Sequence, residues 1–263
     1  MNTILITGAG SGIGAATAMK LSERGGLRLL LVGRRRETLE DVRRQLRCQE
    51  NHVVGVMDIA DGQLLVDWLN GPEAALEQHP LVGVFANAGV GGPNAFGVGD
   101  RWHEIIRVNL TGTYNTLQAC YPFLKMSGGV THALVTSSVL ARFGVPGQSA
   151  YVASKTGLLG LVRSLALEWS SDQIMVNAIC PGWVDTEMAR ASIQALAEAE
   201  GISFEESKRR QEAILPTQRV SKPEEIAQWV DFLFSGLGEN CTKQRIETFT
   251  GQALDVNSGS WMG

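Results

Sequence analysis

Residues 3–14 read TILITGAGSGIG, an apolar run followed at once by a turn rich in glycine. Residues 3–7 have the composition of a buried strand, and residues 15–24 show helical periodicity. The stretch therefore predicts a strand, a glycine turn and a helix in succession. Gly8, Gly12 and Gly14 lie in that turn, where missing side chains let backbone N–H groups and the helix N-terminus approach a pyrophosphate.

The rest of the chain repeats this alternation of strand and helix. Further strands are predicted at residues 27–32, 53–57, 81–85, 133–136, 174–179 and 253–256. Helices are predicted at residues 37–47, 63–69, 101–125 with an interruption near Gly112, 149–169 and 223–234. This spacing predicts an α/β fold, a doubly wound parallel sheet of about seven strands with helices on both faces. No linker or change in composition divides the chain, so residues 1–263 are expected to form one domain.

Composition narrows the class of protein. The net charge of −4 and the absence of a basic stripe give no basis for nucleic-acid binding. No apolar window approaches the length of about 20 residues that a membrane span needs, and the N-terminus lacks the basic start of a signal peptide. A cytoplasmic protein is therefore expected.

The cysteines and histidines are scattered. No C-x-x-C pair occurs, and no histidine stands at ligand spacing, so a metal site is not expected. The cysteines are expected to be reduced and mostly buried; they are Cys48, Cys120, Cys180 and Cys241.

The candidate chemistry lies between Ser138 and Lys155. A helix that begins near Ser149 places Tyr151 and Lys155, four residues apart, on one face. A neighbouring ammonium stabilises a phenolate and lowers its pKa, which makes Tyr151 a possible general acid or base. Ser138 follows a predicted strand, and that strand could bring its hydroxyl to the same place. The alternative is an ordinary helix surface, since this spacing also arises by chance.

Other notable residues also follow predicted strands. Asp58, Asn87, Ser138 and the pair Pro181-Gly182 each come at a strand end. Ligands of parallel α/β sheets bind beyond the carboxyl ends of the strands, so these residues are expected to share one edge.

Six motifs occur in order along essentially the whole chain. They are TGxxxGxG at the N-terminus, Asn87-Ala88-Gly89, Asn109, Ser138, Tyr151-x-x-x-Lys155 and Pro181-Gly182. Together they resemble the short-chain dehydrogenase/reductase family, which implies a Rossmann-type fold and a nicotinamide cofactor. Three features depart from the family pattern. Ala86 stands at a usual asparagine, VNSG replaces the commoner V-D-G-G, and residues 236–249 form a longer stretch than expected.

The resemblance implies a role for each candidate catalytic residue. Tyr151 would exchange the substrate proton, Lys155 would lower its pKa and hold the nicotinamide ribose, and Ser138 would hydrogen-bond the substrate oxygen. Asn109 would position a water in a proton relay, or alternatively would only satisfy buried backbone groups near Gly112. Ser137 is an alternative donor that strand alternation would point away from the site.

The second strand end indicates which nicotinamide cofactor is used. An acidic residue there would bind the 2′-hydroxyl of NAD, but this chain has Gly33 followed by three arginines, which favours NADP(H). A solvated helix start with Arg36 paired to Glu40 is the alternative. By position in the family, the cofactor-binding set comprises Gly8, Ser11, Gly12, Ile13, Gly14, Arg34, Arg35, Asp58, Ile59, Asn87, Ala88, Gly89, Tyr151, Lys155, Pro181, Gly182, Val184 and Thr186.

Residues 186–215 form a polar, helix-rich insertion that looks like the family's substrate lid. The substrate is expected to contact Ser138, Val139, Gln148, Trp183 and Met188, with core packing an equal alternative for Met188. Residues 207–210, Ser-Lys-Arg-Arg, could receive an acidic carrier protein or be a solvated helix face.

The resemblance implies an NADP-dependent oxidoreductase for a small-molecule ketone or secondary alcohol, acting without nucleic acid, membrane or metal. The alternatives are a 3-oxoacyl or polyketide ketoreductase acting on carrier-tethered substrates and a non-catalytic NADP-binding redox sensor. The helix at residues 153–169 is apolar nearly all round, so a homo-oligomer is expected, a tetramer or a dimer.

Overall fold

The computed structural model describes residues 1–237 and 246–263. Seven parallel strands form one sheet in the order β3-β2-β1-β4-β5-β6-β7. They are β1 (Asn2–Thr7), β2 (Leu27–Gly33), β3 (Val53–Val56), β4 (Leu81–Ala86), β5 (Thr131–Thr136), β6 (Ile174–Pro181) and β7 (Ala253–Val256). The order reverses direction between β1 and β4, so the doubly wound sheet that the sequence predicts is confirmed.

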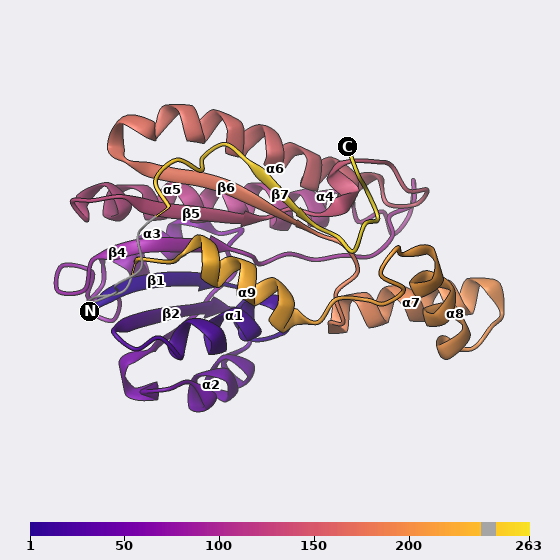
Figure 1. Ribbon diagram of the computed structural model, residues 1–263, viewed down its shortest axis with the longest axis horizontal. Coiled ribbons are helices and arrows are strands. Elements are labelled where there is room, and N and C mark those ends of the chain that lie inside the picture. The colour runs from indigo at the N-terminus through magenta and orange to yellow at the C-terminus, as the bar shows by residue number, and fades with distance from the viewer. Residues whose placement is uncertain (238–245) are drawn as a thin grey trace.

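Helices cover both faces of the sheet (Figure 1). On one face lie α1 (Gly12–Ser22), α2 (Arg36–Gln45) and α9 (Pro223–Leu233). On the other lie α3 (Gly62–Asn70), α5 (Gly112–Met126) and α6 (Ser149–Glu168).

Alternation along the central strands produces the two cores. Ile4 and Ile6 of β1 pack against the α1 face, while Leu5 between them packs against the α6 face. Both faces are apolar because both are covered, which explains why the strands read as continuous hydrophobic runs.

The helix predicted at residues 101–125 is interrupted differently from the expectation. It comprises α4 (Trp102–Ile106), the π-helical turn η2 (Arg107–Thr111) and α5, with no break in the chain of helical turns. The irregularity thus ends just before Gly112 and contains Asn109. Such π turns insert one extra residue into a helix and occur often at functional sites.

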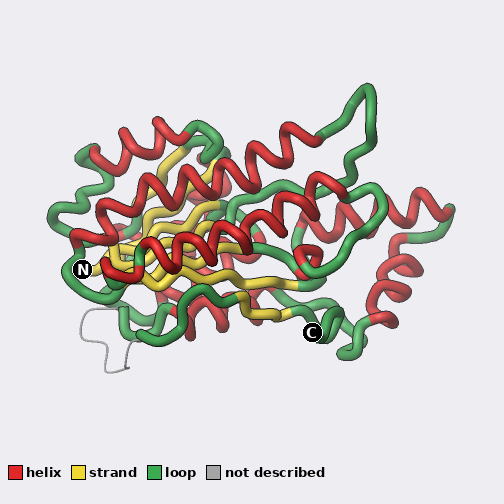
Figure 2. Tube along the Cα trace, turned by 90° about the horizontal axis from the view of Figure 1, so that it is seen from above, coloured by secondary structure: helices red, strands yellow, loops and turns green. Residues whose placement is uncertain are grey.

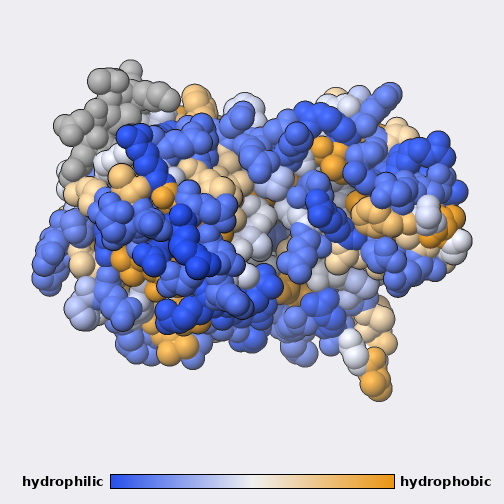
Figure 3. Space-filling view, turned by 90° about the horizontal axis from the view of Figure 1, so that it is seen from below, coloured by the Kyte–Doolittle hydropathy of each residue, from blue (hydrophilic) through white to orange (hydrophobic). Residues whose placement is uncertain are grey.

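Two short helices project from the end of the molecule toward which the strands run (Figures 1 and 2). They are α7 (Glu187–Glu200) and α8 (Phe204–Ile214), within the predicted insertion at residues 186–215. The main body and this extension enclose a hollow that Figure 3 shows from below. A cavity of about 270 Å³ lies there, lined by Ser11, Gly12 and Thr186 among others.

Two expectations fall partly outside the described residues. Residues 238–245 are outside the described part of the chain. They belong to the long stretch at residues 236–249, and they contain Cys241. Of the described cysteines, Cys120 and Cys180 are buried and Cys48 is exposed, and all three are free thiols. No helix in the described part of the chain is long and apolar enough to cross a membrane.

Candidate active site

Ser138, Tyr151 and Lys155 come together at the carboxyl ends of β5 and β6. Ser138 follows β5 and begins the 3-10 turn η3 (Val139–Ala141), where its Oγ accepts a hydrogen bond from the Leu140 N–H at 3.1 Å. Tyr151 lies in the first turn of α6 and Lys155 one turn later. The Lys155 Nζ donates to the Thr136 carbonyl at 2.8 Å and lies 5.6 Å from the centroid of the Tyr151 ring. A serine hydroxyl, a phenol and an ammonium therefore meet at one point.

Burial dominates the electrostatics of this group. It lowers the pKa of Lys155, whose residue is only 4 % exposed, to about 8, and the nearby Cys180 thiol acts in the opposite direction. It also raises the pKa of Tyr151 above its ordinary value, while a hydrogen bond with Ser138 acts to lower it. Lys155 was expected to lower the pKa of Tyr151. In the chain by itself that pKa is raised instead, because desolvation of the phenol outweighs the effect of the Ser138 hydrogen bond.

Ser137 points away from this group, as the alternation predicts. Its Oγ donates to the Lys155 carbonyl at 2.8 Å, on the inner side of α6. It therefore ties β5 to α6 rather than facing Tyr151 and Ser138.

Asn109 lies fully buried in the π turn, close to Lys155. Its Oδ1 accepts from the Val90 N–H at 2.8 Å, and its Nδ2 donates to the Val90 carbonyl at 2.9 Å and to Ser154 Oγ at 3.2 Å. A Cβ placed on Gly89 would lie 3.1 Å from Asn109 Oδ1 and 3.5 Å from Lys155 Nζ, so Gly89 lets both side chains converge on the loop after β4. The Asn109 amide does satisfy buried backbone groups, and it does so beside Lys155.

The glycine turn forms a cradle that side chains would fill. Gly8 and Gly12 have φ angles of +67° and +53°, in the left-handed region that favours glycine. A Cβ on Gly14 would approach the Gly8 carbonyl oxygen to 2.2 Å, so α1 begins directly against the end of β1. Ser11 is the N-cap of α1 and makes no side-chain capping bond, and Ile13 is half-buried against the helix-covered core. The N-terminal N–H groups of α1 therefore remain uncapped by side chains.

Asn87, Ala88 and Gly89 form the wall beside this cradle. The Asn87 side chain bridges two strands, since its Nδ2 donates to the Thr7 carbonyl at 3.2 Å and its Oδ1 accepts from Thr136 Oγ1 at 3.0 Å. The backbone N–H of Ala88 donates to Thr7 Oγ1 at 3.1 Å. These contacts hold the ends of β1, β4 and β5 together.

Charged groups lie just after the ends of β2 and β3. Burial alone would raise the pKa of Asp58, but hydrogen bonds from the Ala60 N–H and Arg107 and the charges of Arg107 and Arg34 hold it below its ordinary value. Arg107 Nη2 lies 3.2 Å from Asp58 Oδ2. Ile59, buried next to Asp58, packs against Gly112.

The three predicted arginines take different positions. Arg34 acts on Asp58 through its charge, Arg35 lies 3.8 Å from Glu187 of α7, and Arg36 lies 3.9 Å from Glu40. The alternative pairing of Arg36 within its own helix is therefore confirmed for that residue.

The segment after β6 links the cradle to the projecting helices. Gly182 is pressed against Asn257, since a Cβ on it would lie 2.8 Å from the Asn257 carbonyl oxygen. Pro181 is the last residue of β6, and Val184 is buried beside a bridge to Ser221. Thr186 is the N-cap of α7: its Oγ1 accepts from the Ala189 N–H at 3.2 Å, and its methyl lies against Gly12.

The predicted substrate contacts lie on η3, at the start of α6, and in the segment from β6 to α7. Val139 is buried in η3, Gln148 is the N-cap of α6, and the Trp183 carbonyl accepts from the Ser221 N–H at 2.9 Å. Met188 is 41 % exposed and lies against Gly91 of the loop after β4, so the core-packing alternative is wrong for this residue.

Two features of the site escaped the sequence interpretation. Arg107 lies in the π turn, two residues before Asn109, and forms an ion pair with Asp58. Its closeness in sequence to Asn109 was the only signal that it belongs to the site. Arg142, four residues after Ser138, binds Asp255 of β7 at 3.0 and 3.2 Å and stacks on the Trp261 ring at 4.8 Å. It ties the loop after Ser138 to the C-terminal segment.

Comparisons with known proteins give a consistent result. A family model described as short chain dehydrogenase matches residues 2–197. The chain is 34 % identical to cis-4-hydroxycyclohexanecarboxylate dehydrogenase of Sinomonas cyclohexanicum, over 88 % of each protein. It is 31 % identical to a 3-oxoacyl-(acyl-carrier-protein) reductase of Aggregatibacter actinomycetemcomitans, over 93 % of this chain and 96 % of that protein. A crystal structure of the actinorhodin polyketide ketoreductase with NADPH is similar with a TM-score of 0.86 at 30 % identity, over 98 % of this chain and 97 % of that one.

Proposed function

The chain belongs to the short-chain dehydrogenase/reductase family, and on that premise we propose that it interconverts ketones and secondary alcohols with NADP(H). The observation that carries the proposal is the meeting of Ser138, Tyr151 and buried Lys155 at the strand ends. A protein that only bound the nucleotide would have no use for a proton-transfer group beside it.

The cradle fits a dinucleotide. Uncapped N–H groups at the start of α1 favour an anion such as the pyrophosphate, and Gly8, Gly12 and Gly14 leave it room. Thr186 closes the other side of that cradle. When bound, the nicotinamide ring supplies or accepts the hydride.

The side chains of the site divide the remaining work. Tyr151 has a raised pKa and is protonated near neutral pH, so in the reducing direction it donates its proton to the substrate oxygen. Ser138 hydrogen-bonds that same oxygen and orients it. Lys155 holds the cofactor ribose and stabilises the phenolate that Tyr151 becomes, and Asn109 fixes the loop that faces Lys155.

Charge at the adenosine end supports NADP(H) over NAD(H). Gly33 leaves no carboxylate to bind a free 2′-hydroxyl, and Arg34 and Arg35 follow it on an exposed turn. Their guanidinium groups can bind a 2′-phosphate in a bidentate manner. Asp58 and Ile59 border the adenine.

The projecting helices, with residues 186–215, serve as the substrate lid of a single domain that spans residues 1–263. Met188 faces the loop after β4 across the opening. Trp183, Val139 and Gln148 complete a largely apolar wall, which suits a hydrophobic ketone.

A carrier-tethered acyl substrate is the second candidate, favoured by the similarity to 3-oxoacyl and polyketide reductases. An assay of NADPH oxidation separates the free-ketone function from the carrier-tethered one. It compares 4-oxocyclohexanecarboxylate and simple cyclic ketones with 3-oxoacyl thioesters on an acyl carrier protein. A higher kcat/KM for the carrier-bound thioester selects the second candidate. Failure to oxidise NADPH with any ketone would overturn both.

A further inference from the structure

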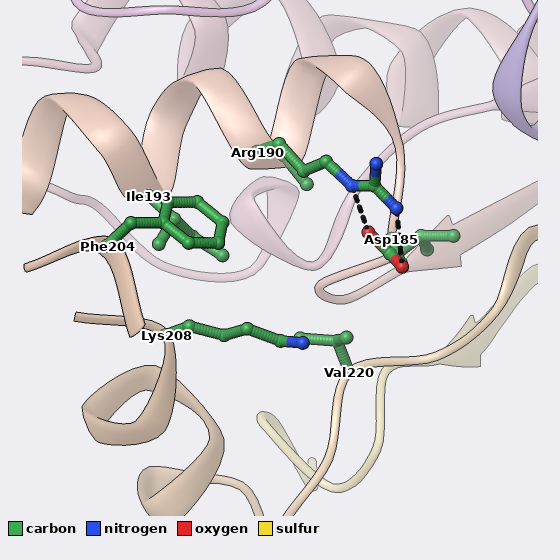
Figure 4. Close-up of a pocket in the computed structure, with 8 residues that line it drawn as sticks. Asp185, Arg190, Ile193, Phe204, Lys208 and Val220 are labelled. Atoms are coloured by element: carbon green, nitrogen blue, oxygen red, sulfur yellow. Dashed lines mark hydrogen bonds and ion pairs between the residues drawn. The ribbon is translucent and has the colours of Figure 1, made fainter. Parts of the chain in front are cut away.

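The basic residues of α8 are not equivalent. Arg209 lies 2.6 Å from Glu206, and Arg210 bonds both Glu206 and Glu200 at 2.9 Å, so both charges are neutralised on the helix surface. Ser207 is buried and donates to the Ile193 carbonyl of α7. Lys208 makes no hydrogen bond or ion pair with any residue in 1–237 or 246–263, and its side chain extends from α8 toward Val220 (Figure 4).

Lys208 borders a cavity of about 190 Å³ at the base of α7 and α8, here called the lid-base pocket. Figure 4 shows its side chain stretched along one side of the space, with the ion pair of Asp185 and Arg190 opposite and Ile193 and Phe204 at one end. The complete lining is Val184, Asp185, Ala189, Arg190, Ile193, Phe204, Lys208 and Val220.

The lining combines an apolar surface with a net positive charge, because it holds two cationic side chains and one carboxylate. Val184, Ala189 and Ile193 are buried, and Phe204 and Val220 are half-buried. The Nε and Nη2 of Arg190 donate hydrogen bonds to the two carboxylate oxygens of Asp185, at 2.7 and 3.0 Å. Lys208 also acts on the Asp185 carboxylate through its charge, but that carboxylate is bonded to Arg190, so the lining keeps a net positive charge beside its apolar walls. Charges in such surroundings favour a counter-ion, because screening by water is weaker there.

We propose that the lid-base pocket binds a small carboxylate with a short hydrocarbon chain. Its carboxylate contacts the Lys208 Nζ, and its chain packs against Ile193, Phe204 and Val220. Met188, which lies against Gly91, is not among the residues that line this pocket, whereas Asp185 and Arg190 line both this pocket and the cavity beside Ser11 and Gly12.

Occupation of this pocket acts on the lid. Ala189 and Arg190 belong to the first turns of α7, directly after Thr186, which contacts Gly12, and Met188, which contacts Gly91. A ligand wedged beneath these turns restrains α7 against the main body. A carboxylate in the lid-base pocket would therefore contact the first turns of α7.

Titration calorimetry with hexanoate, in the absence of cofactor and ketone, tests the proposal independently of the proposed reaction. The expected result is binding at one site that hexanol and hexylamine do not reproduce. Lys208→Met keeps the length of the side chain without its charge and is expected to weaken hexanoate binding at least tenfold. Arg209→Gln, on the same helix but ion-paired at the surface, removes the same charge and is expected to change the affinity less than twofold.

A second variant tests the cavity itself. Ala189→Leu fills the pocket from its buried wall and is expected to abolish hexanoate binding, with circular dichroism establishing that α7 still folds. If this variant does not fold, the Lys208→Met result decides. Equal hexanoate affinity in Lys208→Met and the unmodified protein, equal affinity for hexanol, or no hexanoate binding at millimolar concentration would each overturn the proposal.

Discussion

At the scale of single residues, the chemistry depends on how burial changes the charges of Tyr151 and Lys155. The spacing of these residues predicts that they lie together, and it does not predict the direction of each pKa shift. Desolvation raises the pKa of the phenol and lowers that of the ammonium, so in the chain alone both groups move toward their neutral forms. A charged ligand bound beside these two side chains is therefore expected to change their pKa values.

Replacement of Tyr151 by Phe removes the proton donor and leaves the ring. We expect kcat for ketone reduction to fall by about 10²–10⁴-fold, because general acid catalysis contributes that much. The dissociation constant for NADPH, followed by its fluorescence, is expected to stay within a few-fold of the unmodified value. Unchanged turnover in a folded variant would refute the assigned role of Tyr151.

The pKa of Lys155, about 8, predicts a pH effect on cofactor binding. Lys155 is a cation below that pH and becomes neutral above it, and the cation is the stronger hydrogen-bond donor to the ribose hydroxyls that Lys155 is proposed to hold. NADPH is therefore expected to bind more weakly as the pH rises through about 8. Lys155→Met should bind weakly at neutral pH and show no such step, so an identical pH profile in both proteins would contradict the prediction.

Arg107 affects the adenosine end through Asp58. If the proposed NADP(H) site is right, its guanidinium neutralises a carboxylate that would otherwise repel the 2′-phosphate of the cofactor. Arg107→Ala is expected to weaken NADPH binding by roughly three- to tenfold and NADH binding less, since the ion pair is partly exposed.

The double variant Arg107→Ala with Asp58→Asn tests this explanation. Removing the carboxylate should restore most of the NADPH affinity, measured by fluorescence titration. If the double variant binds NADPH as weakly as Arg107→Ala alone, Arg107 contacts the cofactor directly instead.

At the scale of elements, the turn between β1 and α1 determines where the cofactor can lie. Gly14→Ala would place a Cβ 2.2 Å from a backbone oxygen, and the strand end cannot move away without loss of register. We expect the variant to lose about 1–3 kcal/mol in the free energy of unfolding, measured with urea, together with its NADPH affinity.

Gly144→Ala is the matched control for Gly14→Ala. Nothing lies within 4 Å of a Cβ placed at Gly144, and its φ is not in the left-handed region. Its unfolding free energy is expected to stay within about 0.5 kcal/mol of the unmodified value. An equal loss in both variants would mean that close packing at Gly14 is not the cause.

The elements themselves could largely be predicted from the sequence, because apolar runs and glycine turns act locally. The common location of Asn87 and Ser138 could be predicted as well, because parallel strands bring their carboxyl ends to one edge of the sheet. The π turn could not be predicted, because one extra residue in a helix leaves the periodicity almost unchanged. The Arg107 and Arg142 ion pairs depend on partners 49 and 113 residues away, which no local pattern indicates.

At the scale of the whole molecule, α6 leaves an apolar side chain facing outward. Its inner side packs on the sheet, but Leu167 is 81 % exposed and continues a helix rich in apolar residues. Contact with a second copy of the chain would bury this surface. We therefore expect a homo-oligomer, a tetramer or a dimer.

Light scattering at micromolar concentration checks this expectation. The unmodified protein should show a multiple of the 28.4 kDa chain mass, and Leu167→Glu should shift the distribution toward smaller species. Because Leu167 is exposed in the single chain, that variant is expected to keep its unfolding free energy per chain. A monomer for the unmodified protein would contradict the prediction.

The π turn at Arg107–Thr111 has a consequence for any redesign of cofactor preference. Within this one turn, Arg107 reaches the adenosine end through Asp58, while Asn109 reaches the catalytic end beside Lys155. Both ends of the proposed dinucleotide site thus depend on one helical turn, and we expect a change that moves this turn to disturb cofactor recognition and catalysis together. A variant intended to accept NAD(H) should therefore be built at Gly33, Arg34 and Arg35, which lie outside this turn.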